Sequence, residues 1–353
     1  MDTLSARVAA VLRRGAGSGL ALADQAVLSA ANFTGIYLLA RFMGPREFGV
    51  LMLAQTAVLL VTGLHNAIIV EPQSVLASAL DRRAFGEFLA AMLPVQRAVS
   101  AALAAVCLVT ALAIVGLNGG DLAVAVLLPA VVSAALLQEF VRRTMYTRSQ
   151  AGDALAIDGV CALLQLGGIG ALLGTGHARP AWALAIAAAA ALAAAVLGLR
   201  RLRRRYPAAP GAGRRARTEV MRRTWRLGKW LLGRSAVTWL GVNGHVWLIA
   251  GLLGTEALGV YRAALHLVNV INPLRMAAGA YLTPRGGRLY QRRGADALCI
   301  WARRMSLLLL AGLLPFAVPL VAFPEHILRL AYGAKYAHQA LGPVLALGAL
   351  AQL

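Results

Sequence analysis

The chain has 353 residues, of which 59% are hydrophobic and 14% charged, and its mean hydropathy is +0.69. A soluble domain is about half apolar and about a quarter charged, so this composition excludes an ordinary soluble enzyme and favours a membrane protein. The net charge of +21 comes almost entirely from Arg, and these residues lie between apolar stretches, which favours topology determinants over nucleic-acid binding.

Nine apolar stretches are long enough to cross a membrane, because a spanning helix needs roughly 20 mostly apolar residues, and a tenth apolar run begins near 341 and is cut off at Leu353. Residues 1–15 are short and basic, and the run after them is too long for a cleaved signal peptide, so we expect a retained first helix. Charged or basic connections separate the helices at 71–97, 141–153, 200–226 and 284–304. The predicted spans are 19–40, 48–70, 98–117, 121–140, 154–174, 180–199, 227–253, 258–282, 305–323 and a run from 341 to the chain end. The expected fold class is an all-α polytopic helix bundle.

The distribution of basic residues predicts the orientation of these helices. If the N-terminus is cytoplasmic, the inside connections hold 28 Lys or Arg residues and the outside connections hold five. Cytoplasmic loops of membrane proteins are enriched in Lys and Arg, so the bias favours a cytoplasmic N-terminus. We therefore expect a multi-pass protein of the bacterial inner membrane, with anionic membrane lipids among its partners.

An internal repeat divides the chain into two halves. Residues 38–50, LLARFMGPREFGV, align without gaps with residues 248–260, LIAGLLGTEALGV, at an offset of 210. Identical residues pair Leu38 with Leu248, Ala40 with Ala250, Gly44 with Gly254, Gly49 with Gly259 and Val50 with Val260. We predict an N-terminal six-helix bundle over 1–199, a basic cytoplasmic linker over 200–226 and an incomplete C-terminal bundle of about four helices over 227–353. Transporters built from two related halves bind substrate between them and expose it alternately to each side.

Three stretches resemble a known family. Residues 39–49, LARFMGPREFG, resemble the opening signature of polysaccharide-biosynthesis flippases, the Wzx-like branch of the multidrug/oligosaccharidyl-lipid/polysaccharide exporter superfamily. The stretch ILRLAYGAKYAHQALGPVLALGALAQ, from Ile327, resembles that family's outer loop before its tenth helix, with Gly333, Tyr336 and Ala340 as its features. Residues 284–296 also fit. Members of the family have more helices than the ten predicted here, so the resemblance implies that the chain is short at its C-terminal end.

The resemblance implies a flippase for an undecaprenyl-pyrophosphate-linked oligosaccharide, moved from the cytoplasmic to the periplasmic leaflet. The product would feed the assembly of O-antigen (lipopolysaccharide), capsule or exopolysaccharide. The implied partners are this lipid-linked oligosaccharide and polysaccharide polymerase or assembly proteins, without nucleic acid.

Polar side chains form stripes along four of the predicted spans. One stripe holds Arg234, Thr238, Gly241 and His245, at helical spacing on one face, and a second holds Arg262, His266 and Asn269. The other two spans carry Gln25, Ser29 and Asn32 with Asp24 beside them, and Gln55, Thr62 and Asn66. Because ionisable residues in spanning helices are costly, we expect these stripes to face a polar cavity.

We assign hypothetical roles by chemistry. Arg suits a pyrophosphate because it stays charged and can bond bidentately, so we expect Arg234 and Arg262 to contact the phosphates. Sugar or water contacts are expected from Asn32, Asn66 and Asn269, and His245 and His266 are further candidate substrate-binding residues of the cavity. Asp24 is a candidate for coupling transport to H⁺ or Na⁺. The alternatives are that the two arginines extend to the headgroups, that Asp24 and Arg234 neutralise each other, and that the polar stripes are interhelical hydrogen bonds.

Two other function classes are considered alongside the flippase. An ion-coupled exporter of drugs or other small molecules would need a second deep acidic residue, for which Asp158 is the best candidate. A membrane glycosyltransferase or ligase would need a catalytic acid, base or metal site, and the sequence shows no HExxH, Walker A or GxSxG pattern and no metal-ligand spacing at its three cysteines. A passive scaffold in polysaccharide assembly also remains open. We therefore predict no catalytic residue, no metal ligand and no cofactor.

Overall fold

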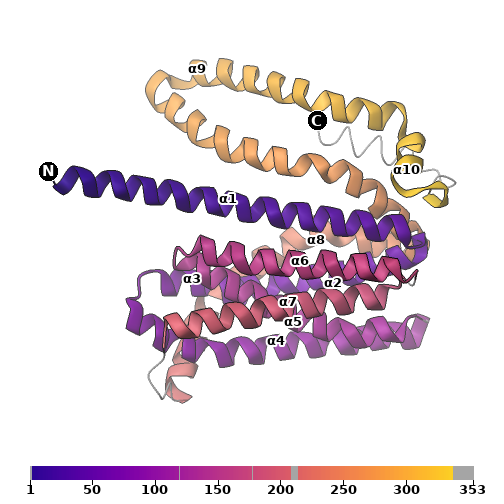
Figure 1. Ribbon diagram of the computed structural model, residues 1–353, viewed down its shortest axis with the longest axis horizontal. Helices are drawn as coiled ribbons and strands as arrows, with labels where there is room; N and C mark the ends of the chain where they lie inside the picture. The colour runs from indigo at the N-terminus through magenta and orange to yellow at the C-terminus, as the bar shows by residue number, and fades with distance from the viewer. Residues whose placement is uncertain (1, 119, 177, 208–213, 337–353) are drawn as a thin grey trace. The chain divides into compact units, whose positions relative to one another are not determined.

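The computed structural model describes residues 2–118, 120–176, 178–207 and 214–336 (Figure 1). All the regular structure in this part of the chain is helical, as expected for an all-α membrane protein. The helices are α1 (Asp2–Phe42), α2 (Pro45–His65), the π-helical turn η1 (Asn66–Val70), α3 (Glu71–Ser78), α4 (Arg82–Asn118), α5 (Leu122–Thr147), α6 (Ala151–Gly174), α7 (Pro180–Arg205), α8 (Arg214–Val268), the 3₁₀ turn η2 (Asn269–Ile271), α9 (Asn272–Ala322), α10 (Pro324–Tyr332) and the 3₁₀ turn η3 (Ala334–Tyr336).

Seven helical stretches in the described residues are long and apolar enough to cross a membrane. They are Pro45–Ser78, Arg82–Val115, Leu122–Thr147, Ala151–Gly174, Pro180–Arg205, Arg217–Val268 and Arg285–Pro315. One stretch, Arg217–Val268, contains the predicted span 227–253 and the first part of the predicted span 258–282, whose remainder lies in η2 and α9. The predicted first span lies in α1, which is not among the seven. The tenth predicted span, from 341 onward, lies outside the described residues, as does Ala340.

The charged connections are more helical than the sequence pattern indicated. Residues 82–97 form the first part of α4, residues 141–147 end α5, and residues 214–226 begin α8. Within the predicted linker, residues 200–205 end α7. Arg, Glu, Leu and Ala are good helix formers, so a helix that leaves the apolar region need not stop at its first charged residue.

The helices form two compact units. Unit 1 consists of Met1–Gly35 and Val50–Gly254, and unit 2 consists of Ile36–Gly49 and Thr255–Leu353. These units reflect packing within the structure and do not test the predicted halves 1–199 and 227–353, which stay a prediction. Each unit is described by itself below.

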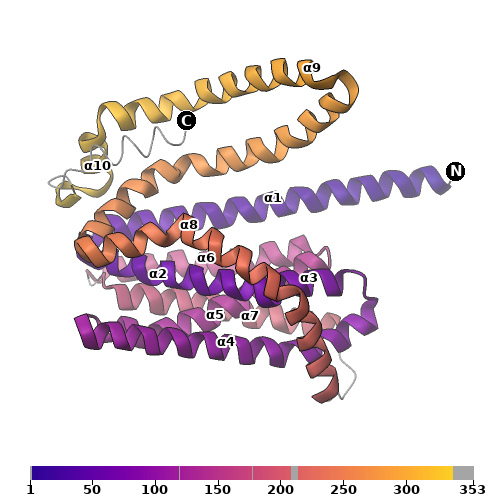
Figure 2. The same ribbon diagram turned by 180° about the vertical axis from the view of Figure 1, so that it is seen from behind.

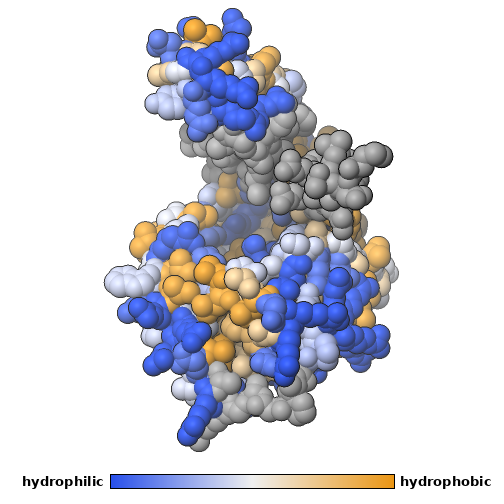
Figure 3. All heavy atoms as spheres, turned by 90° about the vertical axis from the view of Figure 1, so that its left-hand side faces the viewer, coloured by the Kyte–Doolittle hydropathy of each residue, from blue (hydrophilic) through white to orange (hydrophobic). Residues whose placement is uncertain are grey.

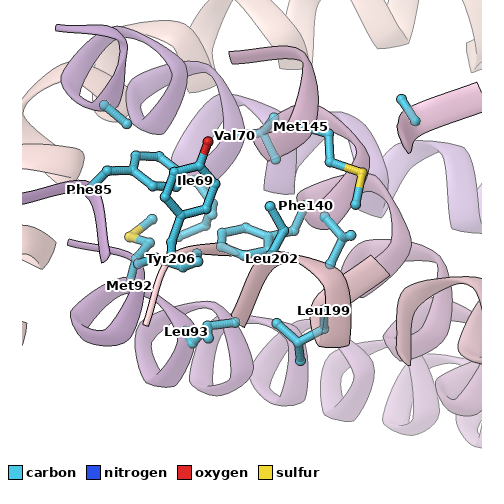
Figure 4. Close-up of a cluster of buried hydrophobic side chains, with 14 of the residues drawn as sticks. Ile69, Val70, Phe85, Met92, Leu93, Phe140, Met145, Leu199, Leu202 and Tyr206 are labelled. Atoms are coloured by element: carbon cyan, nitrogen blue, oxygen red, sulfur yellow. The ribbon is translucent and has the colours of Figure 1, made fainter. Parts of the chain in front are cut away.

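In unit 1, helices α4 to α7 run side by side (Figure 1). Helix α5 packs against α4, α6 and α7, and α7 also packs against α6. At one end of these helices a cluster of buried apolar side chains joins η1, α4, α5 and α7 (Figure 4). The residues labelled there are Ile69, Val70, Phe85, Met92, Leu93, Phe140, Met145, Leu199, Leu202 and Tyr206.

A cationic side chain closes this cluster. The guanidinium carbon of Arg148 lies 4.7 Å from the ring centroid of Phe85 and 5.5 Å from that of Tyr206. Its Nη1 donates to the carbonyl oxygen of Leu80 at 2.8 Å. Cation–π contacts of this kind allow a charged group to cover an apolar core.

Two long helices bend at glycines. In α8 the helix breaks at Gly254, whose φ is 87°, a value that favours glycine because it carries no Cβ. Gly254 is the repeat equivalent of Gly44, where α1 and α2 are also separated, so both copies of the repeat interrupt the helix at the same place. In α9 the break at Gly294 turns the helix back on itself (Figure 1), within the stretch 284–304 that the sequence pattern assigned to a basic connection.

In unit 2, a pair of repeat-related glycines lies at a helix crossing. A Cβ added to Gly49 would lie 1.7 Å from the carbonyl oxygen of Thr255, and one added to Gly259 would lie 1.9 Å from the carbonyl oxygen of Pro45. Pro45 and Thr255 are themselves equivalent in the repeat, so the contact is reciprocal. The two backbones therefore touch where only hydrogen separates them, and no larger side chain fits at either position.

Also in unit 2, two stretches distant in the sequence are joined by hydrogen bonds between basic side chains and carbonyl oxygens at helix ends. Arg41, in the last turn of α1, donates from Nη1 to the carbonyl oxygens of Leu330 (3.1 Å) and Ala331 (2.7 Å), near the end of α10. In return, the ammonium of Lys335 donates to the carbonyl oxygen of Met43, just beyond α1. Cations stabilise helix C-termini because the last carbonyls lack partners within the helix. We call these five residues the clasp.

Aromatic rings pack beside the clasp. The ring centroids of Tyr332 and Tyr336 are 5.5 Å apart, and Tyr37 lies 5.8 Å from Tyr332. Burial raises the pKa of Tyr332 and of Tyr336, so both phenols stay protonated at physiological pH. Burial lowers the pKa of Lys335, and the nearby Glu47 carboxylate opposes this shift. The clasp thus joins residues 39–49 to the stretch from Ile327, two of the stretches whose sequences resemble the flippase family.

We expect Gly49→Ala to lower the free energy of unfolding by about 1–3 kcal/mol, because its methyl group would overlap the Thr255 carbonyl and force the helices apart. The matched control is Gly233→Ala in α8, where no atom lies within 4 Å of the added carbon. The control should be neutral or slightly stabilising, since Ala is the better helix former. Unfolding curves in detergent micelles measure both. Equal stability of the two variants would contradict the close contact between Gly49 and the Thr255 carbonyl.

Candidate functional site

The most deeply buried charges of the described residues form a cluster in unit 1. Asp24 of α1 and Asp158 of α6 are 1% and 0% exposed. Arg142 of α5 lies between them, with Nη1 3.9 Å from Asp24 Oδ2 and Nε 3.8 Å from Asp158 Oδ2. Tyr146, also on α5, donates its hydroxyl proton to Asp24. The cluster therefore joins three helices through groups that are costly to bury unless they are paired.

Two more charged groups complete the cluster on α5. Glu139 accepts hydrogen bonds from Arg142 Nη2 at 2.9 Å and from Arg143 Nε at 2.7 Å. Positions 139, 142, 143 and 146 are spaced i, i+3, i+4 and i+7, which places the four side chains on one face of the helix. Three carboxyl groups thus face two guanidinium groups, and if all are ionised the cluster has one negative charge in excess.

Two carboxylate oxygens in this cluster lack a hydrogen-bond donor. Asp158 Oδ1 accepts from Gln138 Nε2 at 3.2 Å, and Asp24 Oδ2 accepts from Tyr146. The other oxygens, Asp24 Oδ1 and Asp158 Oδ2, are buried and have no hydrogen-bond partner among the described residues. Such atoms are costly unless a proton or a cation compensates them. With one excess negative charge, the cluster has the chemistry to take up a single H⁺ or a monovalent cation.

Arg234 lies elsewhere in unit 1, on α8, and binds a different carboxylate. Its Nη2 is 3.1 Å from both oxygens of Glu71 on α3, and its side chain is 68% exposed. The alternative in which Asp24 and Arg234 neutralise each other is therefore wrong, because Asp24 is paired with Arg142 and Tyr146. Helix α8 passes along α2 and η1 here (Figure 2), with Gly228 against the backbone of Ala67 and Ile68.

The other predicted contacts of unit 1 differ in exposure. Asn32 on α1 is exposed, His245 on α8 is partly buried, and Asn66 is partly buried in the π-helical turn η1. Beside Asn66, the ring of His65 hydrogen-bonds the side chain of Gln96. A π-helical turn is a local departure from α-helix that often occurs at functional sites. In unit 2, His266 is buried, Arg262 partly buried and Asn269 exposed, and all of these assignments stay predictions.

The sequence pattern missed Arg142 and Tyr146 as partners of Asp24, and Glu139 as a further partner of Arg142. It assigned Arg142 to the basic connection 141–153, as a topology determinant. The i, i+3, i+4, i+7 spacing of these groups was the available signal, since it continues the face of a helix rather than a loop. Within the described residues, no three His, Cys, Asp or Glu side chains gather in a way that could hold a metal ion.

Comparisons with known proteins connect this fold to a family. The profile of a family described as "Polysaccharide biosynthesis protein" matches residues 25–285. A solved structure of a MOP superfamily transporter from Pyrococcus furiosus, for which a binding pocket of reversed polarity has been described, is similar with a TM-score of 0.53. The alignment has 13% sequence identity and covers 93% of this chain and 74% of that chain, so it shows the fold alone. No curated protein sequence matches the chain.

We expect Arg142→Met to lower the free energy of unfolding by about 3 kcal/mol, because it leaves the buried Asp24 and Asp158 without their shared counterion. The control Arg143→Met removes a guanidinium that also bonds Glu139 but is 50% exposed, against 18% for Arg142, so its effect should be about 0–1 kcal/mol. Chemical unfolding in detergent, followed by Trp fluorescence, compares the two. Equal losses would show that Arg142 does not hold the buried acids.

Proposed function

We propose that this chain, which belongs to the polysaccharide biosynthesis protein family, moves an undecaprenyl-pyrophosphate-linked oligosaccharide across the bacterial inner membrane. It is a multi-pass membrane protein with the fold of a MOP superfamily transporter. The observation that carries the proposal is the Asp24–Arg142–Asp158 cluster, because ionisable groups buried among membrane helices mark transport and proton pathways. The mechanism proposed is alternating access between two halves of the protein, without chemical conversion of the substrate.

The substrate requires cationic and polar contacts, since neither a pyrophosphate nor a sugar crosses hydrocarbon without them. Arg234 supports this requirement, because its guanidinium already binds the carboxylate of Glu71, an anion that a phosphate could replace. We assign Arg262 as a second phosphate contact. The sugar contacts proposed are Asn32, Asn66 and Asn269, and His245 and His266 are proposed as further substrate-binding residues of the cavity. The product would supply O-antigen, capsule or exopolysaccharide assembly, with a polymerase or other assembly proteins as partners.

Coupling to an ion gradient is proposed at Asp24. Its buried oxygen Oδ1 has no hydrogen-bond partner among the described residues, and the guanidinium of Arg142 is paired with both Asp24 and Asp158. Uptake of one H⁺ or one monovalent cation would remove the excess negative charge and alter the attraction between α1, α5 and α6. A change in that attraction is a physical means of linking ion binding to helix movement.

A second candidate function is ion-coupled export of a small molecule. Asp158 favours it, because it supplies a second deep carboxyl group beside Asp24. The guanidinium of Arg142 is paired with both carboxyls and offsets much of their charge. The pair is therefore better suited to a proton or small cation than to a large cationic drug, and we propose it as a coupling site within the flippase.

We expect deletion of the gene to abolish the surface polysaccharide and to leave lipid-linked oligosaccharide on the cytoplasmic face of the membrane. The wild-type gene should restore the glycan, whereas Arg234→Ala and Arg262→Ala should not, despite normal amounts in the membrane. Immunoblots of surface glycan and accessibility of the lipid-linked sugar to added enzymes measure both effects. Unchanged glycan after deletion would remove the flippase function, and export of small molecules would then be tested.

We expect Asp24→Asn to reduce the stimulation of transport by an imposed ion gradient roughly tenfold, within the usual range of coupling energies. The experiment uses purified protein in liposomes with a fluorescent lipid-linked oligosaccharide and imposed pH or Na⁺ gradients. Asp153→Asn is the matched control, since Asp153 on α6 pairs with Arg201 and Arg205 at a partly exposed site. If both variants respond to the gradients as the wild type does, coupling does not take place at Asp24.

A further inference from the structure

The first part of α8 is a strongly basic helix that neither the Asp24 cluster nor the proposed substrate contacts use. Residues 214–230 carry seven basic residues and a single acidic one, Glu219. One face of this segment is fixed to the rest of unit 1. Thr224 is fully buried, and a Cβ added to Gly228, one turn on, would lie 3.0 Å from the backbone of Ala67 and Ile68. The arginines therefore lie on the remaining faces of a helix that is held in place.

These arginines line a cavity of about 750 Å³ between α3 and α8. Its walls are Leu76, Glu219, Arg222, Arg223, Arg226 and Leu227. Glu219 accepts from Arg222 Nη2 at 2.8 Å and from Arg223 Nε at 2.7 Å, which orients both guanidinium groups. Three guanidinium groups against one carboxylate leave two positive charges in excess. The cavity thus combines a cationic surface with leucine side chains.

The position of the cavity along α8 places it at a membrane boundary. Helix α8 continues from the cavity into the apolar part of the candidate span Arg217–Val268. Two exposed aromatic residues flank the transition, Trp225 and Trp230, and the Lys229 ammonium lies 5.3 Å from the centroid of the Trp230 ring. Trp with Lys or Arg is typical of the interface between hydrocarbon and headgroups. Figure 3 looks onto one end of the helices, where hydrophilic side chains surround a hydrophobic patch.

We propose that this cavity binds the phosphate headgroup of an anionic phospholipid of the surrounding bilayer. The guanidinium groups match a phosphate in charge and hydrogen-bonding geometry, and Leu76 and Leu227 offer contacts for the glycerol and upper acyl chain. A nucleic acid would match the charge but not the apolar wall. The inference requires only that the chain is embedded in a membrane and does not depend on the proposed transport activity.

The experiment compares lipid retention by two triple variants of the full chain. The cavity variant is Arg222→Gln/Arg223→Gln/Arg226→Gln. The matched control, Arg200→Gln/Arg203→Gln/Arg204→Gln, removes the same charge from exposed positions at the end of α7. Both are purified in nanodiscs of phosphatidylcholine with phosphatidylglycerol, and native mass spectrometry counts the lipids that stay bound. The cavity variant should retain phosphatidylglycerol roughly tenfold less well than the wild type, because its three arginines line one cavity and bond one headgroup. The control should stay within about twofold, because it removes only the general attraction of basic residues for an anionic surface.

Other outcomes would overturn the proposal. Equal losses in the two triple variants would indicate a general charge effect. Retention of a polyprenyl pyrophosphate but not of phosphatidylglycerol would make the cavity a loading site for the transported lipid, and displacement of phosphatidylglycerol by an added oligonucleotide would favour a nucleic-acid site. Should the triple variant unfold, Arg226→Gln alone leaves the Glu219 bonds intact and should still weaken retention, whereas unchanged retention by this folded variant would contradict the inference.

Discussion

A guanidinium group buried among apolar helices is tolerated only where negative charge surrounds it, and Arg142 satisfies this constraint with three carboxyl groups. One of them, Asp24, comes from α1 and another, Asp158, from α6, so the mutual attraction fixes three helices at one depth. The apolar contacts of unit 1 have no such directional requirement, because dispersion and lipid exclusion allow helices to slide. The cluster therefore determines the register that the rest of the unit 1 packing follows.

The membrane-spanning helices and the repeated glycines could be predicted from the sequence. The all-α membrane class follows from the apolar runs, and the gapless repeat contains the paired glycines Gly44 with Gly254 and Gly49 with Gly259. Three of these glycines, Gly49, Gly254 and Gly259, have a structural role. The structure shows why no larger residue suits Gly49, Gly254 or Gly259. Gly254 adopts a backbone conformation that favours glycine, and Gly49 and Gly259 lie where two backbones leave no room for a Cβ. A sequence repeat can show which residues matter without showing that they touch.

The partners of Asp24 could not be predicted in the same way, because a basic residue at the end of an apolar run has two explanations. Arg142 and Arg143 are adjacent, and both resemble topology determinants in sequence. In the structure they bond the same Glu139, yet their side chains are 18% and 50% exposed, so only Arg142 is also the counterion of the two buried aspartates. Which of the two arginines is buried depends on the face of α5 that packs against α1 and α6. Those helices are remote in sequence, so the local pattern does not show which face that is.

The clasp has a consequence for how the protein is made. The two ends that it joins are separated by about 290 residues, from 289 between Arg41 and Leu330 to 292 between Met43 and Lys335. Helix α1 is synthesised first, yet the partners of its C-terminal end leave the ribosome only after nearly all the described chain. Closing such a long loop is slow and entropically costly. Until then the end of α1 must be kept from wrong partners by the lipid or by an insertion factor, and completion of unit 2 becomes a late checkpoint in biogenesis.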